Sequence, residues 1–204
     1  SNVGEVMIRL LFVRHGQTEF NVKKRVQGWC DSPLTQEGIK QAESLIDVLK
    51  EVDICAAYSS TSERCRDTLD IILNDRDIKK YDRKGLKEIH FGLAEGERIE
   101  KVFPNGTANL SGYQDIQGES KKQALKRFED EIHSIVSLYD EANILIVTHG
   151  SILKEFFSHI DLGFKQAAIE VNGSVNRLIS NCSLSIVEYN QGNYCLVSYG
   201  KTYY

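Results

Sequence analysis

The 204-residue sequence lacks most of the features that would place it in a specialised class of protein. It contains no apolar stretch long enough to cross a membrane and no signal-peptide pattern at its start. It also lacks an excess of basic residues, because the formal net charge is −4. We therefore expect neither nucleic acid nor a membrane as a partner, and any attraction for anions must be local.

Cysteine offers no framework either. The five cysteines are odd in number, scattered and without a C-x-x-C pair: Cys30, Cys55, Cys65, Cys182 and Cys195. This pattern argues against a disulfide scaffold and a zinc knuckle, and it predicts reduced thiols in the cytoplasm. Catalytic thiol chemistry is the less favoured alternative, since a free cysteine is usually a buried packing residue.

Several catalytic motifs are missing as well. The sequence has no H-E-x-x-H metal motif, no G-x-x-x-x-G-K-[ST] phosphate loop and no G-x-G-x-x-G dinucleotide loop. Ser151 follows Gly150 but lacks the second glycine of a nucleophile elbow. Metalloproteases, nucleotide-binding enzymes of these kinds and α/β-hydrolases therefore fit poorly.

What the sequence does have is a histidine after each of two apolar runs. Residues 10–13 lead into Arg14-His15-Gly16, and residues 144–147 lead into Thr148-His149-Gly150. Such runs are typical of buried parallel strands, whose carboxyl ends bind ligands in open α/β sheets. We expect one site built from both histidines, and Arg14 indicates an anionic ligand. The alternative for His149 is a histidine that is only hydrogen-bonded at a strand end.

Strand and helix patterns alternate along the rest of the chain, which predicts a single α/β domain. Thr35 is a plausible cap for a helix with apolar residues at 39, 42, 46 and 49, and Ser120 with Gln123 forms a capping box. Ser60 with Glu63 predicts a second capping box. Other predicted elements are strands at 56–59 and near 79–81, a short helix and then a loop within 93–118, a helix around 152–160, and a hairpin of 184–189 with 194–199.

Other charged residues near this predicted site carry two interpretations each. Arg64 lies in the first turn of the helix predicted to start at Ser60, where guanidinium and helix dipole could face one anion. It could equally be a surface arginine. The basic run 23–25 is either a solvated loop or a rim that attracts charged substrates. His133 and His159 are interpreted as residues of helix faces.

Six segments in order resemble the motifs of the histidine phosphatase superfamily, whose fold is phosphoglycerate mutase-like. They are LFVRHGQTEFN (11–21), RVQGWCDSPLT (25–35), YSS (58–60) leading to Arg64 and Thr68, LKEIHFG (86–92) with Glu95-Gly96, GES (118–120) and VTHG (147–150). The resemblance implies one domain over residues 3–204, built as a three-layer αβα sandwich around a mostly parallel sheet.

The resemblance also implies a phosphohistidine mechanism, with His15 as nucleophile and Glu88 as the acid that protonates the leaving oxygen. Arg14, Arg64 and His149 would hold the phosphoryl oxygens. Asn21, Gln27 and the backbone of Gly28 would add neutral donors, and Thr18 and Gly150 belong to the same substrate-binding set. The cations supply the positive charge, so no metal or other cofactor is expected.

Within the superfamily, the sequence favours a phosphatase acting on a small phosphorylated metabolite. Mutases carry an arginine where this chain has Ile89, and an arginine pair where residues 93–118 offer only Arg98 and Lys101. A phosphoglycerate mutase and a non-catalytic phosphate-binding protein are the alternatives. We expect a monomer or homodimer. The content of the 93–118 segment (Phe103, Asn105, Asn109, Tyr113 and Gln114) suggests a lid that selects a polar or sugar-like group.

Overall fold

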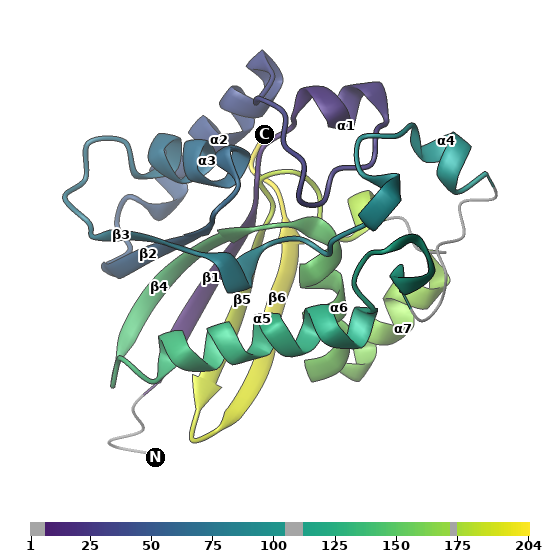
Figure 1. Ribbon diagram of the computed structural model, residues 1–204. Coiled ribbons are helices and arrows are strands. Elements are labelled where there is room, and N and C mark those ends of the chain that lie inside the picture. The colour runs from purple at the N-terminus through teal and green to yellow at the C-terminus, as the bar shows by residue number, and fades with distance from the viewer. Residues whose placement is uncertain (1–6, 105–111, 172–174) are drawn as a thin grey trace.

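The computed structural model describes residues 7–104, 112–171 and 175–204, which form a mixed six-stranded sheet with helices on both faces (Figure 1). The strands are β1 (Ile8–Arg14), β2 (Ile54–Ser60), β3 (Lys80–Arg83), β4 (Ala142–Thr148), β5 (Leu184–Asn190) and β6 (Asn193–Lys201). Their order is β3-β2-β4-β1-β5-β6. The first four strands run parallel, whereas β5 pairs antiparallel with β1 and β6 antiparallel with β5.

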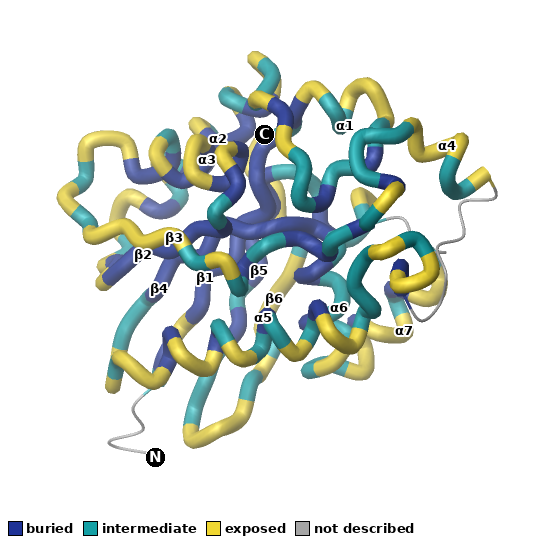
Figure 2. The backbone as a smooth tube through the Cα atoms, viewed as in Figure 1, coloured by how far each residue is buried: buried dark blue, intermediate teal, exposed yellow. Residues whose placement is uncertain are grey.

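Each face of the sheet buries its own apolar core, as the dark interior of Figure 2 shows. Helices α2 (Gln36–Leu49) and α3 (Glu63–Leu73) cover one face, where Leu45 and Leu69 are buried. Helices α5 (Lys121–Val136), α6 (Gly150–Ile160) and α7 (Leu162–Glu170) cover the other, where Phe128 and Phe156 are buried. The predicted single three-layer αβα domain is confirmed, and residues 3–6 of its predicted span lie outside the described residues.

The remaining elements are short and lie around the carboxyl end of the sheet. They are α1 (Glu19–Lys23), α4 (Ile99–Val102) and the single-turn helices η1 (Lys84–Leu86), η2 (Gly92–Ala94), η3 (Gln114–Ile116) and η4 (Val175–Arg177). Part of the segment expected to form a lid, including Asn105 and Asn109, falls outside the described residues. Within the described part of the chain, no helix is long and apolar enough to cross a membrane.

The sheet register brings the motif-bearing strand ends together. Arg14 at the end of β1 pairs with Thr148 at the end of β4, and β4 also pairs with β2. Strand β4 thus lies between β1 and β2, although it follows both in the chain. Because parallel strands end at one edge, the residues after all three meet there.

Most of the predicted local signals are confirmed. The Thr35 hydroxyl accepts the Gly38 N–H at the start of α2, and Ser120 and Gln123 form a complete capping box at α5. The hairpin of β5 and β6 is also as predicted. A capping box that we did not predict joins Thr18 and Asn21 at the start of α1.

The helix start predicted at Ser60 is wrong. Ser60 is the last residue of β2, paired with Arg83 of β3, and α3 begins at Glu63 after Ser62. Sheet pairing extends the strand past the local capping signal, and Ser62 makes no side-chain capping bond. The carboxylate of Asp31 accepts the Glu63 N–H instead, at 2.6 Å.

Candidate active site

A cavity of about 470 Å³ lies at the carboxyl end of the sheet. Of the catalytic and substrate-binding residues expected from the sequence, five line it: Arg14, His15, Asn21, Gln27 and Glu88. The others contact these residues or lie just behind them. The two interpretations of the basic run 23–25 apply to different residues. Lys24 and Arg25 line the cavity, whereas Lys23 pairs with Glu19.

His15 presents one ring nitrogen for chemistry and keeps the other occupied. Its Nδ1 lies 2.8 Å from the carbonyl oxygen of Gly16, which can only accept, so Nδ1 carries the proton. The lone pair of Nε2 then accepts the N–H of Arg64 Nε at 3.3 Å. Burial, with the nearby charges of Arg64 and Arg14, lowers the pKa of His15 well below its usual value. The imidazole is therefore neutral, as a nucleophile must be.

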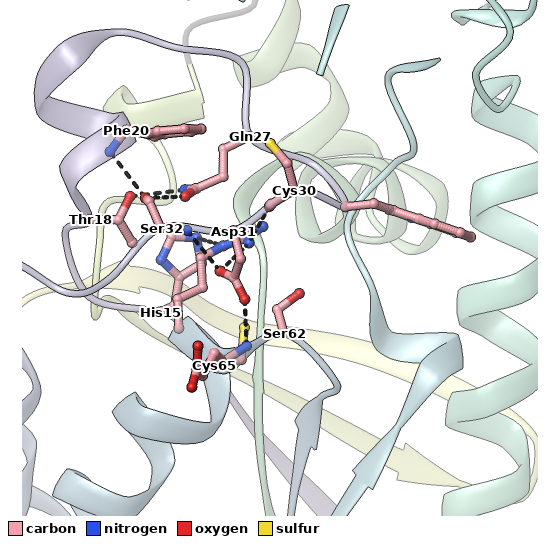
Figure 3. Close-up of polar contacts among 12 residues, drawn as sticks. His15, Thr18, Phe20, Gln27, Cys30, Asp31, Ser32, Ser62 and Cys65 are labelled. Carbon is pink, nitrogen blue, oxygen red and sulfur yellow. Dashed lines mark hydrogen bonds and ion pairs between the residues drawn. The ribbon is translucent and has the colours of Figure 1, made fainter. Parts of the chain in front are cut away.

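Arg64 is fully buried, so it is not the surface arginine of the alternative interpretation. Besides His15, its guanidinium donates to the carbonyl oxygens of Gly28 (2.7 Å) and Cys30 (2.9 Å). It also forms a 2.8 Å ion pair with Asp31 and lies 3.0 Å from His149 Nδ1. Figure 3 shows Asp31 beside His15 and Cys30. This carboxylate lies in a motif, but sequence reasoning gave it no role.

His149 meets His15 through Arg64, with ring centroids 5.4 Å apart. A guanidinium N–H only donates, so Nδ1 of His149 is an acceptor, and Nε2 carries the proton toward Ser60 Oγ at 2.8 Å. Burial and the charge of Arg64 lower the pKa of His149 well below its usual value. The two strand-end histidines thus form one site, and the hydroxyl of Ser60 belongs to it rather than to a helix cap.

Glu88 is tied to the first turn of α6. Its carboxylate accepts the backbone N–H groups of Ser151 (3.0 Å), Ile152 (2.8 Å) and Ile89 (2.9 Å). Burial raises the pKa of Glu88, and the N–H groups of Ile89 and Ser151 limit that rise. A buried carboxyl with a raised pKa can hold a proton to deliver.

The backbone at Glu88 is held by two further side chains. Its carbonyl oxygen accepts from the indole N–H of Trp29 and from Arg127, which is itself paired with Glu119 at 2.8 Å. The GES segment therefore supports the acid from outside the cavity.

The side chain of Arg14 lines the cavity and packs against the backbone of Gly150. Its Nη1 donates to Asn176 (2.6 Å) and to the carbonyl of Ile179 (2.8 Å), whereas its buried Nε has no partner among the described residues. A Cβ at Gly150 would lie 3.0 Å from the guanidinium carbon and 2.6 Å from Val175. Gly150 therefore makes room for the arginine. A phosphoryl oxygen would satisfy the Nε donor.

Comparisons with known proteins agree with this geometry. The model of the histidine phosphatase superfamily (branch 1) matches residues 10–202. The chain belongs to the histidine phosphatase superfamily. It is 32% identical to "Probable phosphoglycerate mutase GpmB" of Serratia proteamaculans, over 91% of this chain and 86% of that protein.

The solved structures similar to this chain include one named as a mutase and one named as a phosphatase. The crystal structure of phosphoglycerate mutase from Bacillus anthracis has a TM-score of 0.84 at 25% identity, covering 97% of this chain and 94% of that one. The α-ribazole phosphatase of Shigella flexneri has a TM-score of 0.76 at 25% identity, covering 95% and 96%. The comparisons thus establish the superfamily, but the names of these relatives do not decide between a mutase and a phosphatase.

Hydrogen bonds link Thr18 with both Asn21 and Gln27, and Figure 3 shows Thr18 beside Gln27. Asn21 and Gln27 line the cavity, while Thr18 is fully buried and accepts the Gln27 amide N–H at 2.9 Å. The N–H of Gly28 donates to Glu95 and its carbonyl accepts from Arg64. Thr18 is therefore placed to support the cavity-lining Gln27, and Gly28 is placed to support Arg64.

The thiols show no sign of nucleophile activation. All five cysteines are free, and burial raises the pKa of Cys30 to about 11 and of Cys182 to about 12. Cys65 lies 3.5 Å from His149 Nε2, and burial raises its pKa strongly. Cys30, Cys65 and Cys182 therefore favour the protonated thiol over the nucleophilic thiolate. Among the described residues, no cluster of three or more His, Cys, Asp or Glu side chains could hold a metal ion.

Glu95 holds the loop that carries Gly28. Its carboxylate accepts the backbone N–H groups of Gly28, Trp29, Cys30 and Phe91 at 2.9–3.2 Å. Burial acts to raise the pKa of Glu95, but these hydrogen bonds outweigh it and the pKa is lowered. Glu95 was part of a motif in the sequence, and its structural task emerges only from the fold.

We expect Glu95→Gln to lower the free energy of unfolding by about 2 kcal/mol near neutral pH, because charge-assisted bonds are replaced by weaker ones. A folded pKa below the unfolded one gives stability that is present above the unfolded pKa and lost as pH falls through the folded pKa. Urea unfolding at about pH 7 and about pH 4 should therefore show the difference from wild type shrinking in acid.

The control for this prediction is Glu97→Gln, which removes the same charge from a side chain that is 45% exposed. It should leave the unfolding free energy within about 0.5 kcal/mol of wild type. A Glu95→Gln protein as stable as this control at neutral pH would contradict the assigned role.

Proposed function

We propose that this protein is a phosphomonoester hydrolase that acts on a small phosphorylated metabolite through a phosphohistidine at His15. The observation that carries the proposal is the position of the two cations of the 93–118 segment. Arg98 and Lys101 pair with Glu100 and Glu97, are 64% and 70% exposed, and do not line the cavity. A mutase must hold a small acid in the site while that acid is rephosphorylated. The 93–118 segment places no cation in the cavity to bind the carboxylate of such an acid.

The first half-reaction follows from the geometry at His15. Once a phosphoryl oxygen accepts the N–H of Arg64 Nε in place of His15, the Nε2 lone pair is free to attack phosphorus. The Gly16 carbonyl holds the Nδ1 proton, and the N–P bond forms as the P–O ester bond breaks. The guanidinium groups of Arg14 and Arg64 stabilise the negative charge on the equatorial oxygens. Glu88 transfers its proton to the departing oxygen, which leaves as the alcohol.

The second half-reaction uses the same groups in reverse. Glu88, now a carboxylate, takes a proton from a water molecule as that water attacks the phosphorus of phosphohistidine. The N–P bond breaks, inorganic phosphate forms and the imidazole of His15 returns to its neutral state. The buried cations supply the charge that a metal ion supplies in other phosphatases, so we propose a metal-independent reaction.

A phosphoglycerate mutase is the second candidate, and a specific observation favours it. Lys24 and Arg25 line the cavity, and either cation could bind a substrate carboxylate. The relatives named as phosphoglycerate mutases bring the same possibility to this chain. The two functions differ in what accepts the phosphoryl group from His15: water in the hydrolase, and the small acid in the mutase.

Phosphate release in excess EDTA tests the proposal directly. The substrates are an aryl phosphate, sugar phosphates, phosphoserine and 3-phosphoglycerate, the last with and without a bisphosphoglycerate primer. We expect phosphate release without conversion of 3-phosphoglycerate to its 2-isomer. Primer-dependent isomerisation faster than phosphate release would establish the mutase. A protein that binds inorganic phosphate but shows neither hydrolysis nor isomerisation would be a phosphate-binding protein.

A further inference from the structure

One side of the cavity is apolar and comes from three separate segments. Phe91 follows the Glu88 loop, Ile99 and Phe103 belong to α4 and its end, and Tyr113 precedes η3. The Tyr113 ring packs edge-on against Phe91 (centroids 4.7 Å apart) and Phe103 (5.9 Å apart). We call these four residues the aromatic wall.

The aromatic wall is fixed in place and lies beside the acid. Tyr113 donates its N–H to the Glu119 carbonyl and accepts the Gly118 N–H, so its backbone is anchored at both ends. Burial and the charge of Glu88 both raise the pKa of the Tyr113 hydroxyl, and the two residues line the same cavity. The leaving group departs from the oxygen that Glu88 protonates. The organic part of the ester therefore lies toward this wall.

The aromatic wall itself offers few hydrogen-bonding groups to that organic part, because Tyr113 is the one of its four residues with a polar side chain. The side-chain oxygens of the cavity's amides are already engaged: Asn176 accepts from Arg14, Asn21 accepts from Thr18 and Asn181, and Gln27 accepts from Ser32. The Tyr113 hydroxyl, on a residue that is only 7% exposed, has no hydrogen-bond partner among the described residues. The wall thus gives a leaving group one hydroxyl, whereas a sugar lying against it would need several partners to replace its lost water.

From this wall we infer the substrate class: phosphomonoesters whose organic group is aromatic or otherwise apolar, in preference to sugar and polyol phosphates. The inference rests on the proposed hydrolase function and deepens it. It departs from the sugar-like group suggested by the composition of 93–118, because the described part of that segment turns Ile99, Phe103 and Tyr113 to the cavity. Lys24 and Arg25 line the same cavity and favour the charge of the phosphate.

The test compares two esters with alkyl leaving groups, so that chemical reactivity is matched: benzyl phosphate and glycerol 3-phosphate. For the wild type we expect kcat/KM to favour benzyl phosphate by about tenfold or more. Phe103→Ala should reduce this ratio to about threefold or less, mainly by raising KM for benzyl phosphate, and Phe103→Leu should keep most of it. Leu162→Ala, at an 83% exposed leucine outside the cavity, is the control.

The ratio of the two substrates is independent of the fraction of folded enzyme, so a partly folded variant still gives a result. Equal or better hydrolysis of glycerol 3-phosphate overturns the substrate class and leaves the hydrolase function standing. Calorimetry with benzylphosphonate and 2,3-dihydroxypropylphosphonate covers the case of no turnover. Tighter binding of the benzyl compound would then support the wall as a subsite while the hydrolase proposal fails, and equal binding would overturn both.

Discussion

His15→Ala will abolish turnover, with a loss on the order of 10⁴-fold or more, because the described residues place no other nucleophile to form the bond to phosphorus. Phosphate binding should persist, since Arg14 and Arg64 remain. Removal of the imidazole also frees the N–H of Arg64 Nε for an oxygen of the anion. Phosphate release measures the first effect, and calorimetric titration with inorganic phosphate measures the second.

The wild type should also become labelled when quenched during turnover of a ³²P-labelled ester, and the label should be acid-labile, as a phosphoramidate is. The alanine variant should carry no label. His159→Ala is the matched control, because His159 is exposed, lies outside the cavity and pairs with Glu129. Turnover retained by His15→Ala, or label retained on it, would remove the phosphohistidine mechanism from consideration.

Glu88→Gln should have the second largest effect, and its size should depend on the leaving group. Alkyl esters, whose oxygen needs a proton to depart, should lose about 10²- to 10⁴-fold in kcat, while aryl esters with acidic phenols should lose about tenfold or less. The wild type should be active toward alkyl esters below the raised pKa of Glu88 and lose activity as pH rises through it. That basic limb should be absent from the variant.

The Glu88→Gln substitution also weakens the hydrogen bonds that hold the first turn of α6, and this effect can be measured separately. A glutamine at 88 offers one acceptor oxygen to three backbone N–H groups, so the first turn of α6 loses a hydrogen bond. Aryl phosphate turnover monitors that damage, because it needs the same site without the acid. Equal losses for alkyl and aryl esters would show that Glu88 supports the site and does not act as the acid.

The sequence predicted the parts of the site that follow from strand position. His15, Arg14 and His149 end apolar runs, and parallel strands must bring such residues to one edge. Arg64 was a candidate from its place in the first turn of a predicted helix, although a surface arginine fitted that place equally well. Glu88 came only through the family resemblance, since it has no distinctive local pattern. Asn176, which orients Arg14, carried no signal at all, because its partner is 162 positions away.

The helix start predicted at Ser60 failed because of its tertiary context. Ser60 carries a valid capping pattern, but β2 gains sheet hydrogen bonds by continuing to it, and its hydroxyl is used by His149. Tertiary context thus overrode a local signal. The sugar-like group predicted from the polar composition of 93–118 stays a prediction, because composition does not say which side chains face the cavity.

The contacts of Arg64 also constrain when the protein can become active during synthesis. One guanidinium joins the end of β1, the loop at 28–31 and the residue after β4, and β4 must insert between two strands made long before it. A nascent chain that ends before residue 149 therefore cannot assemble the site, however much of its N-terminal part has emerged. Strand β4 also joins β2 to β1, so the insertion that assembles the site is the one that connects these two parts of the sheet.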